Sequence, residues 1–277
     1  MNEVFVIAGK EIKDGLRNRW VIMITLLMAG LALVLALLGS APTGVTKVSA
    51  FAVTIVSLSS LSIFFIPLIA LLLSYNGIVG ERERGTLLLL LAYPIARWQV
   101  ILGKFLGYFL LLSAAIVVGF GFAGLVIALM SDGEFAGQAW GGFLLLIGSS
   151  VLLGAVFLAL GLMISVLVRE QATAAAIAVG VWLLFVVVYD LGLLGLLASD
   201  KEQVISNEVV TALLLFNPAD AYRMLNLFGS AEASLLSGLA NLSASRDVPQ
   251  WVLAGLLVVW TALPIGAACW FFQRRAL

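Results

Sequence analysis

The chain has 277 residues, of which 63% are hydrophobic and only 11% are charged. Soluble domains carry roughly a quarter charged residues, so this composition excludes an ordinary soluble protein and indicates an integral membrane protein. The formal net charge is zero, which argues against nucleic acid as a partner. The chain has one cysteine, Cys269, and no histidine, which excludes a disulfide framework, a CxxC site and the commonest metal ligand and general base.

Residues 2–19 predict an amphipathic helix that lies in the membrane interface. Its apolar side is formed by Val4, Ala8, Ile12 and Leu16, and its charged side by Lys10, Lys13, Asp14 and Arg17. A secretory signal peptide is the alternative interpretation. The charged lead is long for a signal peptide, however, and the following run 20–38 has about the 20 residues that a membrane span needs.

Six apolar runs are long enough to cross a membrane, which predicts an all-α integral membrane protein with one transmembrane domain over residues 1–277. The predicted spans are 20–38, 50–74, 101–130, 140–168, 173–198 and 251–272. An even number of spans places both termini on the same side of the membrane. The segment 75–100 then lies on the side of the termini, and the segment 199–250 lies on the exterior side.

The basic residues are distributed unequally between the two sides. Eleven lie on the side of the termini, namely Lys10, Lys13, Arg17, Arg19, Arg82, Arg84, Arg97, Lys104, Arg169, Arg274 and Arg275. Four lie on the other side, namely Lys47, Lys201, Arg223 and Arg246. By the positive-inside rule, both termini and the segment 75–100 are cytoplasmic, as expected for a protein of the bacterial inner membrane.

The cytoplasmic segment 75–100 holds the most organised polar motif of the chain. Alternating charges occupy 81–84, Gly85-Thr86 follows as a turn, and five leucines occupy 87–91 before Pro94. The turn and the proline predict a short helix lying across the membrane surface and ending near Tyr93. A solvated loop that only marks the membrane face is the alternative. The segment has no nucleophile and no phosphate-cradling glycine loop.

The exterior segment 199–250 contains one clear helix signal. Asn217 is a helix cap, Pro218 suits the first helical position, and Asp220 suits the positive end of a helix dipole. The helix is expected to continue to Phe228, stop at Gly229, and lie on the outer membrane surface or dip into it. It is a candidate face for an exterior partner, through Asn217, Pro218, Asp220, Tyr222 and Arg223; structural packing is the alternative. Residues 230–250 receive no assignment.

Asp190 is the one ionisable residue well inside a predicted span. Charges in the hydrocarbon are costly, so they mark either a transport path or a structural hydrogen bond, and both remain open for Asp190. Glycines within the spans, such as Gly103 and Gly107, allow helices to approach closely. Their spacing fits packing inside one subunit or a dimer seam.

The motif Glu81-Arg82-Glu83-Arg84-Gly85-Thr86-Leu87, followed by Pro94, Arg97 and Gly103-Lys104, resembles the loop between the second and third spans of type-2 ABC exporter permeases. In that family this loop holds the coupling helix, which fits a cleft in the ATPase subunit. The resemblance extends to the six spans and the N-terminal amphipathic helix. It implies that ATPase coupling involves Glu81, Arg82, Glu83, Arg84, Gly85, Thr86, Pro94 and Arg97, with Glu81 and Glu83 paired to basic groups of the ATPase.

Within the family the chain is most similar to permeases that serve maturation of the copper–sulfur centre of periplasmic nitrous-oxide reductase. The stretches that carry this similarity are 10–20, 66–73 and 217–223. The resemblance implies a homodimer embedded in membrane lipid, with two cytoplasmic ATPase subunits that bind ATP and Mg, and a periplasmic copper-binding protein on the outer face.

The chain itself is expected to have no catalytic residue, no metal site and no cofactor. Its methionines are scattered, so no path of soft ligands for copper is apparent, and a sulfur-containing cargo or mechanical coupling without cargo fits better. Two alternatives are an exporter permease for lipid, glycan or drug, and an intramembrane enzyme. The spans contain no pair of carboxylates and no nucleophile–base pair for the second alternative.

Overall fold

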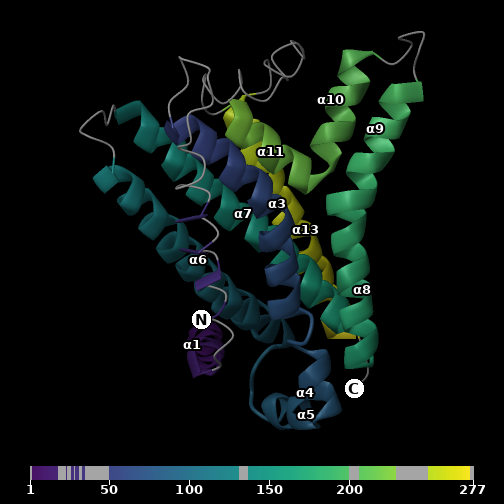
Figure 1. The fold of residues 1–277 in the computed structure, drawn as a ribbon. Helices are drawn as coiled ribbons and strands as arrows, with labels where there is room; N and C mark the ends of the chain where they lie inside the picture. Colours follow the sequence, from purple (N-terminus) through teal and green to yellow (C-terminus); the bar gives the residue numbers. More distant parts are fainter. Residues whose placement is uncertain are drawn as a thin grey trace.

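Helices make up every regular element of the part of the chain that the computed structural model describes (Figure 1). The described residues are 2–17, scattered positions between 23 and 34, 50–130, 137–199, 206–228 and 249–274. Within these residues the predicted all-α fold is confirmed.

Five described helices are long and apolar enough to cross a membrane. They are α3 (Ala50–Ser74), α6 (Arg97–Met130), α7 (Gly137–Leu167), the continuous helix formed by α8 (Gln171–Leu183), η1 (Leu184–Val188) and α9 (Tyr189–Ser199), and α13 (Gln250–Arg274). Their bounds agree with the predicted spans to within a few residues. The predicted first span, 20–38, lies outside the described residues apart from scattered helical positions.

The helix α7 is at the centre of the bundle. Its most apolar stretch is 67% buried, more than in the other four spans, and α7 packs against α3, α6, α11 and α13. Large buried side chains fill these contacts, among them Leu58, Ile66, Phe143, Phe157 and Leu257. Burial of such apolar area is the main source of rigidity in a packed core.

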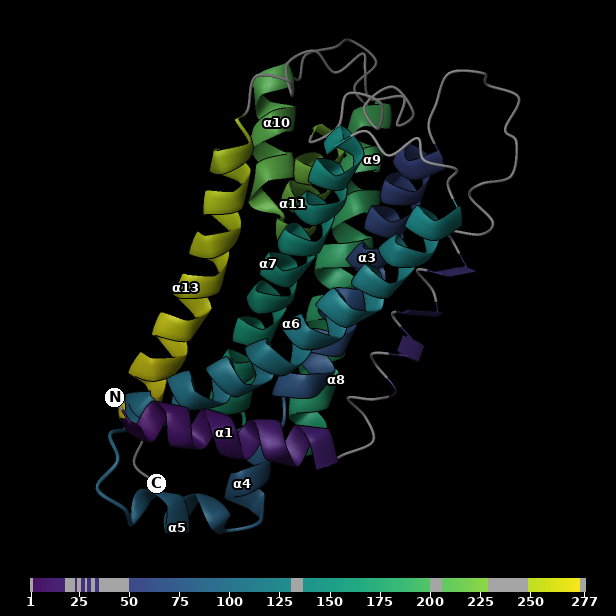
Figure 2. The same cartoon turned by 90° about the vertical axis from the view of Figure 1, so that its left-hand side faces the viewer.

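The first helix, α1 (Asn2–Arg17), lies across the end of the bundle and packs along α6 (Figure 2). Two glycines of α6 permit this contact. A Cβ atom on Gly103 would lie 2.7 Å from the Ile7 Cβ, and one on Gly107 would lie 2.6 Å from the Glu11 Cβ. These glycines therefore support close packing inside one subunit, which was one of the two predicted uses of their spacing.

Two short helices, α4 (Val79–Glu83) and α5 (Thr86–Leu91), lie beyond the end of the bundle, at the same end as α1 (Figures 1 and 2). Gly85 joins them with a backbone φ of 71°, a left-handed conformation that favours glycine. The short helix predicted between Gly85 and Pro94 is thus present, and it ends before the proline.

A helical hairpin between α9 and α13 consists of α10 (Asn207–Phe216) and α11 (Pro218–Phe228). The helix α11 begins at Pro218 as predicted, and the Asn217 side-chain oxygen accepts a hydrogen bond of 3.0 Å from the Ala219 N–H. Its packing agrees with the predicted alternative of a helix that dips into the membrane, and not with a helix on the outer membrane surface. It is buried against α3, α7 and α13, because Ala221, Met224 and Leu225 fill the core.

Candidate functional site

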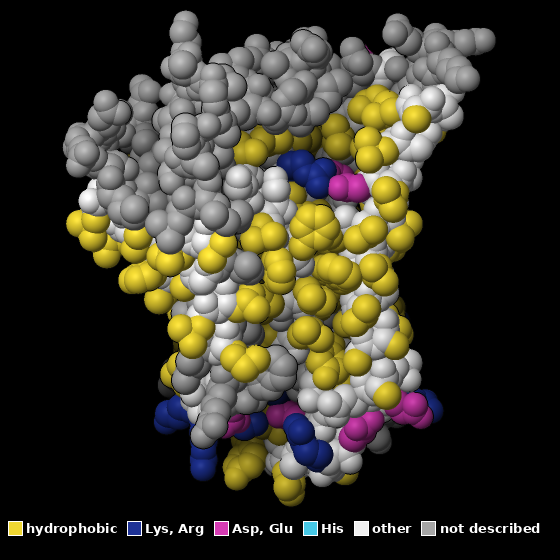
Figure 3. Space-filling view, viewed as in Figure 1, with side chains coloured by type: hydrophobic (Ala, Val, Ile, Leu, Met, Phe, Trp, Pro, Cys, Tyr) yellow, Lys and Arg dark blue, Asp and Glu magenta, His cyan; other side chains and the backbone are white. Residues whose placement is uncertain are grey.

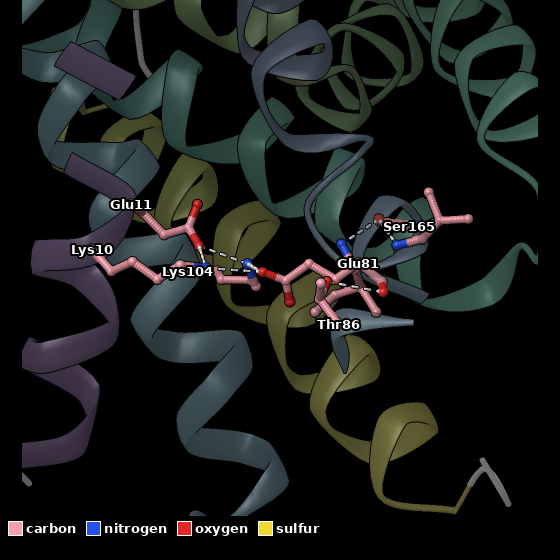
Figure 4. A network of polar contacts seen from close by, with 8 residues as sticks. Lys10, Glu11, Glu81, Thr86, Lys104 and Ser165 are labelled. Carbon is pink, nitrogen blue, oxygen red and sulfur yellow. Dashed lines mark hydrogen bonds and ion pairs between the residues drawn. The ribbon is translucent and has the colours of Figure 1, made fainter. Parts of the chain in front are cut away.

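A buried lysine joins three elements at the end of the bundle that carries α4 and α5 (Figure 4). Lys104 of α6 is only 1% exposed. Its ammonium lies 2.6 Å from the Glu11 carboxylate of α1 and 2.8 Å from the Glu81 carboxylate of α4. Lys10 adds a second contact, 3.2 Å from the same Glu81 oxygen. We call Lys10, Glu11, Glu81 and Lys104 the inner ion cluster.

Opposite charges in the inner ion cluster compensate each other, as buried charges must. Burial lowers the pKa of Lys10, but the Glu81 and Glu11 carboxylates raise it by more, so the net shift is upward. Lys104 therefore connects the amphipathic helix α1 to the α4–α5 segment. This ionic connection adds to the apolar contacts between α1 and α6.

The α4–α5 segment is bonded to two further spans. The Ser165 hydroxyl oxygen of α7 accepts hydrogen bonds from the N–H groups of Ile78 (2.9 Å) and Val79 (3.0 Å), which begin α4. The Glu83 carboxylate accepts a hydrogen bond of 2.7 Å from the N–H of Gln171, the first residue of α8. Together with the Glu81–Lys104 ion pair, these bonds connect the α4–α5 segment to α6, α7 and α8.

Arg97 closes a further contact at the same end. Its guanidinium donates to the carbonyl oxygens of Phe272 (3.1 Å) and Gln273 (3.4 Å) at the C-terminal end of α13. Carbonyl groups at a helix end lack partners within the helix, and a cation near them is favourable. Arg97 thus joins the start of α6 to the end of α13.

The outward side of the α4–α5 segment is apolar and exposed. Leu88 and Leu89 are 64% and 69% exposed, and Tyr93 is 68% exposed, whereas Leu87 is buried. Charged side chains gather at this end of the molecule around that apolar surface (Figure 3). Within the segment itself, Arg84, which joins α4 to Gly85, is exposed, and Arg82 is half-exposed. A hydrophobic centre with a polar rim is the usual anatomy of a protein-binding surface.

The predicted coupling residues lie at the same end of the molecule. Some of them are exposed on the outward side of the segment, and others have side chains that bind inside the bundle. Gly85, Thr86 and Pro94 are exposed, while Thr86 also donates a hydrogen bond of 3.2 Å to the Glu81 carbonyl. The side chains of Glu81 and Arg97 are engaged inside the chain. The hypothesis that Glu81 pairs with basic groups of a partner does not fit this position, because its carboxylate is buried and already paired with Lys104.

Sequence reasoning missed the partners of Glu81. Lys104 entered the sequence interpretation as a cytoplasmic basic residue and as part of the family motif, without a predicted acidic partner, although it stands alone in a strongly apolar run. Lysine is almost never fully buried unless it is paired, so its position was a signal for a buried acidic partner. Nothing in the sequence indicates that Glu11 and Glu81 are that partner, since they are far from Lys104 along the chain.

A second polar cluster lies at the opposite end of the bundle, around α11. The Arg223 guanidinium donates hydrogen bonds of 2.7 Å to Asp220 and 2.7 Å to Asp190 of α9. The Asn217 amide donates to the Asp220 carboxylate (2.9 Å) and to the Phe185 carbonyl of η1 (2.9 Å). We call Asp190, Asn217, Asp220 and Arg223 the outer polar cluster.

Burial raises the pKa of Asp220 from 3.8 to about 7, although Arg223 lowers it in part. Burial likewise raises the pKa of Tyr222 to about 12, despite its contact of 3.0 Å with the Ser150 hydroxyl. The raised pKa means that Asp220 holds its proton at a pH where exposed carboxylates have lost theirs. Asp190 has a structural partner in Arg223, which agrees with one of the two predicted roles for this residue.

The predicted exterior partner face is not presented to the exterior by this chain. Asn217, Pro218, Asp220 and Tyr222 are all buried, and only Arg223 is partly exposed. The reason is that the polar side chains satisfy one another inside the bundle, which allows α11 to pack among apolar helices. Helix capping signals predicted where α11 begins but not the environment into which it folds.

Among the described residues, no group of three or more histidine, cysteine, aspartate or glutamate side chains is arranged to hold a metal ion. The two clusters instead combine acidic and basic side chains that neutralise each other. Their geometry is that of connectors between helices.

Comparison with known proteins agrees with this arrangement. The family model described as "ABC-2 family transporter protein" matches residues 5–277. The chain is 46% identical over 275 residues to the "Probable ABC transporter permease protein NosY" of Stutzerimonas stutzeri, covering 99% of each chain. It is 43% identical over 277 residues to the protein of the same name from Pseudomonas aeruginosa, covering 100% of each. The chain therefore belongs to the ABC-2 family of transporter permeases.

Proposed function

We propose that the chain is the membrane-spanning subunit through which a cytoplasmic ATPase drives movement at the opposite membrane face. The observation that carries this proposal is the two-sided construction of the α4–α5 segment. Its inward side is bonded to α1, α6, α7 and α8, and its outward side exposes Leu88, Leu89 and Tyr93. A partner that seats on this outward surface and moves carries the spans with it.

Permeases of this family are not themselves ATPases, and they bind no cofactor. Hydrolysis of ATP with Mg therefore belongs to a separate ATPase subunit. We propose that the chain forms a homodimer in the bacterial inner membrane and holds two such subunits. The excess of basic residues near the α4–α5 end favours a cytoplasmic location for this end and for both termini.

The similarity to the two NosY permeases supports a finer proposal. The chain serves maturation of the copper–sulfur centre of nitrous-oxide reductase, with a NosF-like ATPase and a periplasmic, NosD-like copper-binding protein. In this proposal the moved species is a sulfur compound, or force alone reaches the periplasmic protein, since the chain has scattered methionines, one cysteine and no histidine. Copper itself prefers thiolate, thioether and imidazole ligands.

The docking part of the proposal is tested by Leu88→Glu combined with Leu89→Glu. These side chains are exposed, so the change adds charge to the outward surface without opening the core. Co-expressed with its ATPase subunit, the variant is expected to insert into the membrane at the parent level but lose the ATPase during purification. Reversal of Glu81 is a poor test, because it breaks the inner ion cluster.

The matched control reverses charges on the other predicted side of the membrane, with Asp132→Lys and Glu134→Lys. This control is expected to retain the ATPase. Retention of a fully coupled ATPase by the Leu88→Glu, Leu89→Glu variant would show that the α4–α5 segment is not the docking element.

A further inference from the structure

The span formed by α8, η1 and α9 is the least packed of the five described spans. Only 11% of its most apolar stretch is buried, against 22–67% in the others. Three of its side chains are buried, namely Ala174, Ala178 and Val186, and none of them is large. Apolar packing within one chain therefore holds this span weakly, and its position depends on other contacts.

Those contacts are polar, and the four on the span's middle and outer half come from α3, α10 and α11. They are Trp182 Nε1 to the Phe64 carbonyl (2.9 Å), Asn217 to the Phe185 carbonyl (2.9 Å), the Tyr189 hydroxyl to the Leu213 carbonyl (2.6 Å), and Arg223 to Asp190 (2.7 Å). The outer half of the span is thus fastened to the hairpin α10–α11.

The inner end of the span has a different fastening, the hydrogen bond between the Glu83 carboxylate and the Gln171 N–H. The residue before α8, Glu170, is extended (φ −120°, ψ 135°), and its own side chain does not cap the helix. The first N–H groups of a helix need acceptors, and a carboxylate there also meets the positive end of the helix dipole. Glu83, in the α4–α5 segment, supplies both the hydrogen-bond acceptor and the negative charge.

The helix widens into a π-helical turn at η1 (Leu184–Val188). This turn lies between the Glu83–Gln171 bond and the outer contacts of Tyr189 and Asp190, and its own Phe185 carbonyl accepts the bond from Asn217. Such turns interrupt the regular hydrogen-bond ladder and frequently occur at functional sites. A helix that is loosely packed, fastened at both ends and interrupted in the middle is able to bend at the interruption when one end is displaced.

We propose that Glu83 is a positioning residue that passes movement of the α4–α5 segment to the span Gln171–Ser199, which bends at η1. This inference rests on the proposed function and adds the element that moves. When a docked ATPase displaces α4, the Glu83 carboxylate carries the start of α8 with it. The outer half then transfers the displacement to α11 through Asp190 and Arg223.

Two variants remove the hydrogen bond from opposite sides. Glu83→Ala removes the acceptor, and Gln171→Pro removes the donor while Glu83 stays in place. Proline is tolerated at the first position of a helix, and the extended Glu170 suits the residue before a proline. Glu83→Gln keeps an oxygen that accepts the bond. Glu170→Gln is the matched control, since it removes a charge at the same helix end without removing that contact.

The reporter is a single cysteine at Leu194, an exposed position of α9, in a Cys269→Ala background. Its rate of reaction with a membrane-permeant maleimide is measured in the complex with its ATPase, without nucleotide and with ATP plus vanadate. The parent, Glu83→Gln and Glu170→Gln are expected to show a several-fold change in rate between the two states. Glu83→Ala and Gln171→Pro are expected to lose most of that change, with the nucleotide-free rate and the bound ATPase at the parent level.

A full nucleotide-dependent change in both Glu83→Ala and Gln171→Pro overturns the inference, and so does a parent without any change. In both cases a bound ATPase leaves the proposed function standing. A shift of the nucleotide-free rate equal in size to the lost change shows a static cap and also overturns the inference. A parent chain that binds no ATPase overturns the proposed function, and the inference with it.

Discussion

The inner ion cluster shows why the charge of a single residue and its surroundings have to be considered together. Lys104 is completely enclosed, whereas Lys10, on the same cluster, has a side chain that is 53% exposed. When a buried charged group loses its partner, water cannot reach it to take the partner's place. The two lysines contact the same carboxylate oxygen, yet their different exposure predicts different contributions to stability.

Lys104→Ala is therefore expected to reduce the free energy of unfolding by about 3–5 kcal/mol, because it leaves the Glu11 and Glu81 carboxylates buried without their main partner. Lys10→Ala is the control and should cost less than about 1 kcal/mol, as for other exposed ion pairs. Thermal unfolding of the purified protein in detergent measures both. Equal effects of the two substitutions would contradict the assignment of Lys104 as the central residue.

The outer polar cluster predicts a dependence of stability on pH. Burial raises the pKa of Asp220 from 3.8 to about 7, with Arg223 and Asp190 as the charged groups that face it. A raised pKa means that the folded state binds the proton more tightly than the unfolded state. This contribution to stability is complete below about pH 4 and is lost as the pH rises through about 7.

Asp220→Asn replaces the carboxyl group with an amide of nearly the same shape, which does not titrate. The unfolding temperature of the parent is expected to fall between pH 5 and pH 8 more steeply than that of Asp220→Asn, and the difference should grow with pH. Parallel pH profiles for the two proteins would show that Asp220 does not titrate in this range.

At the scale of single residues, the sequence predicted Asn217 as a helix cap and Asp190 as an unusual charge, and the structure gives both a definite partner. It did not predict the direction of Glu81. Successive residues of a helix are about 100° apart around its axis, so the charges of α4 point in different directions. Their spacing does not reveal which of them meets the bundle. The inward side is decided by Lys104, which lies in another helix.

At the scale of the elements, the position of α1 depends on two glycines on the surface of α6. Gly103 and Gly107 leave room for the backbone and side chains of α1, and a Cβ atom at either position would collide with them. Close contact also brings Glu11 within reach of Lys104. Packing and charge pairing at this junction are therefore coupled.

Gly103→Val and Gly107→Val are each expected to displace α1 from α6, because cores do not absorb added methyl groups without strain. The expected result is a lower unfolding temperature and faster proteolysis near Arg17. Gly121→Val is the control, since no atom lies within 4 Å of a Cβ at that position. If all three variants behaved alike, the contact between α1 and α6 would not determine the stability of this end.

Long apolar runs predicted the spans to within a few residues, and the turn at Gly85 predicted α5. The sequence left open whether α11 packs inside the protein or serves an exterior partner, and it did not predict the π-helical turn η1. Both depend on contacts between distant segments, such as the bond from Asn217 to the Phe185 carbonyl. Local capping signals carry no information about such partners.

At the scale of the whole molecule, charge and packing agree on two distinct ends. The α4–α5 segment, α1 and the end of α13 gather at one end, and the outer polar cluster lies towards the other (Figure 1). The basic residues near the first end predict that it faces the cytoplasm. This assignment determines where an ATPase has access.

Single cysteines in a Cys269→Ala background test the orientation. Ala96 and Ser199 are both exposed, at opposite ends of the bundle. A thiol reagent that does not cross the inner membrane is expected to label a cysteine at Ser199 in intact cells, and to label one at Ala96 only after the membrane is opened. Labelling at Ala96 in intact cells would reverse the orientation and remove the cytoplasmic docking surface.

The position of α11 has a consequence for how the protein is made. Its polar residues leave the ribosome before α13, the helix that covers α11 together with α3 and α7. Until synthesis reaches the last span, α11 lacks one of its walls, and Arg97 lacks the carbonyl groups at Phe272 and Gln273. Completion of this part of the bundle therefore has to wait for the synthesis of α13, and a chain interrupted before α13 leaves α11 without one of the helices that bury it.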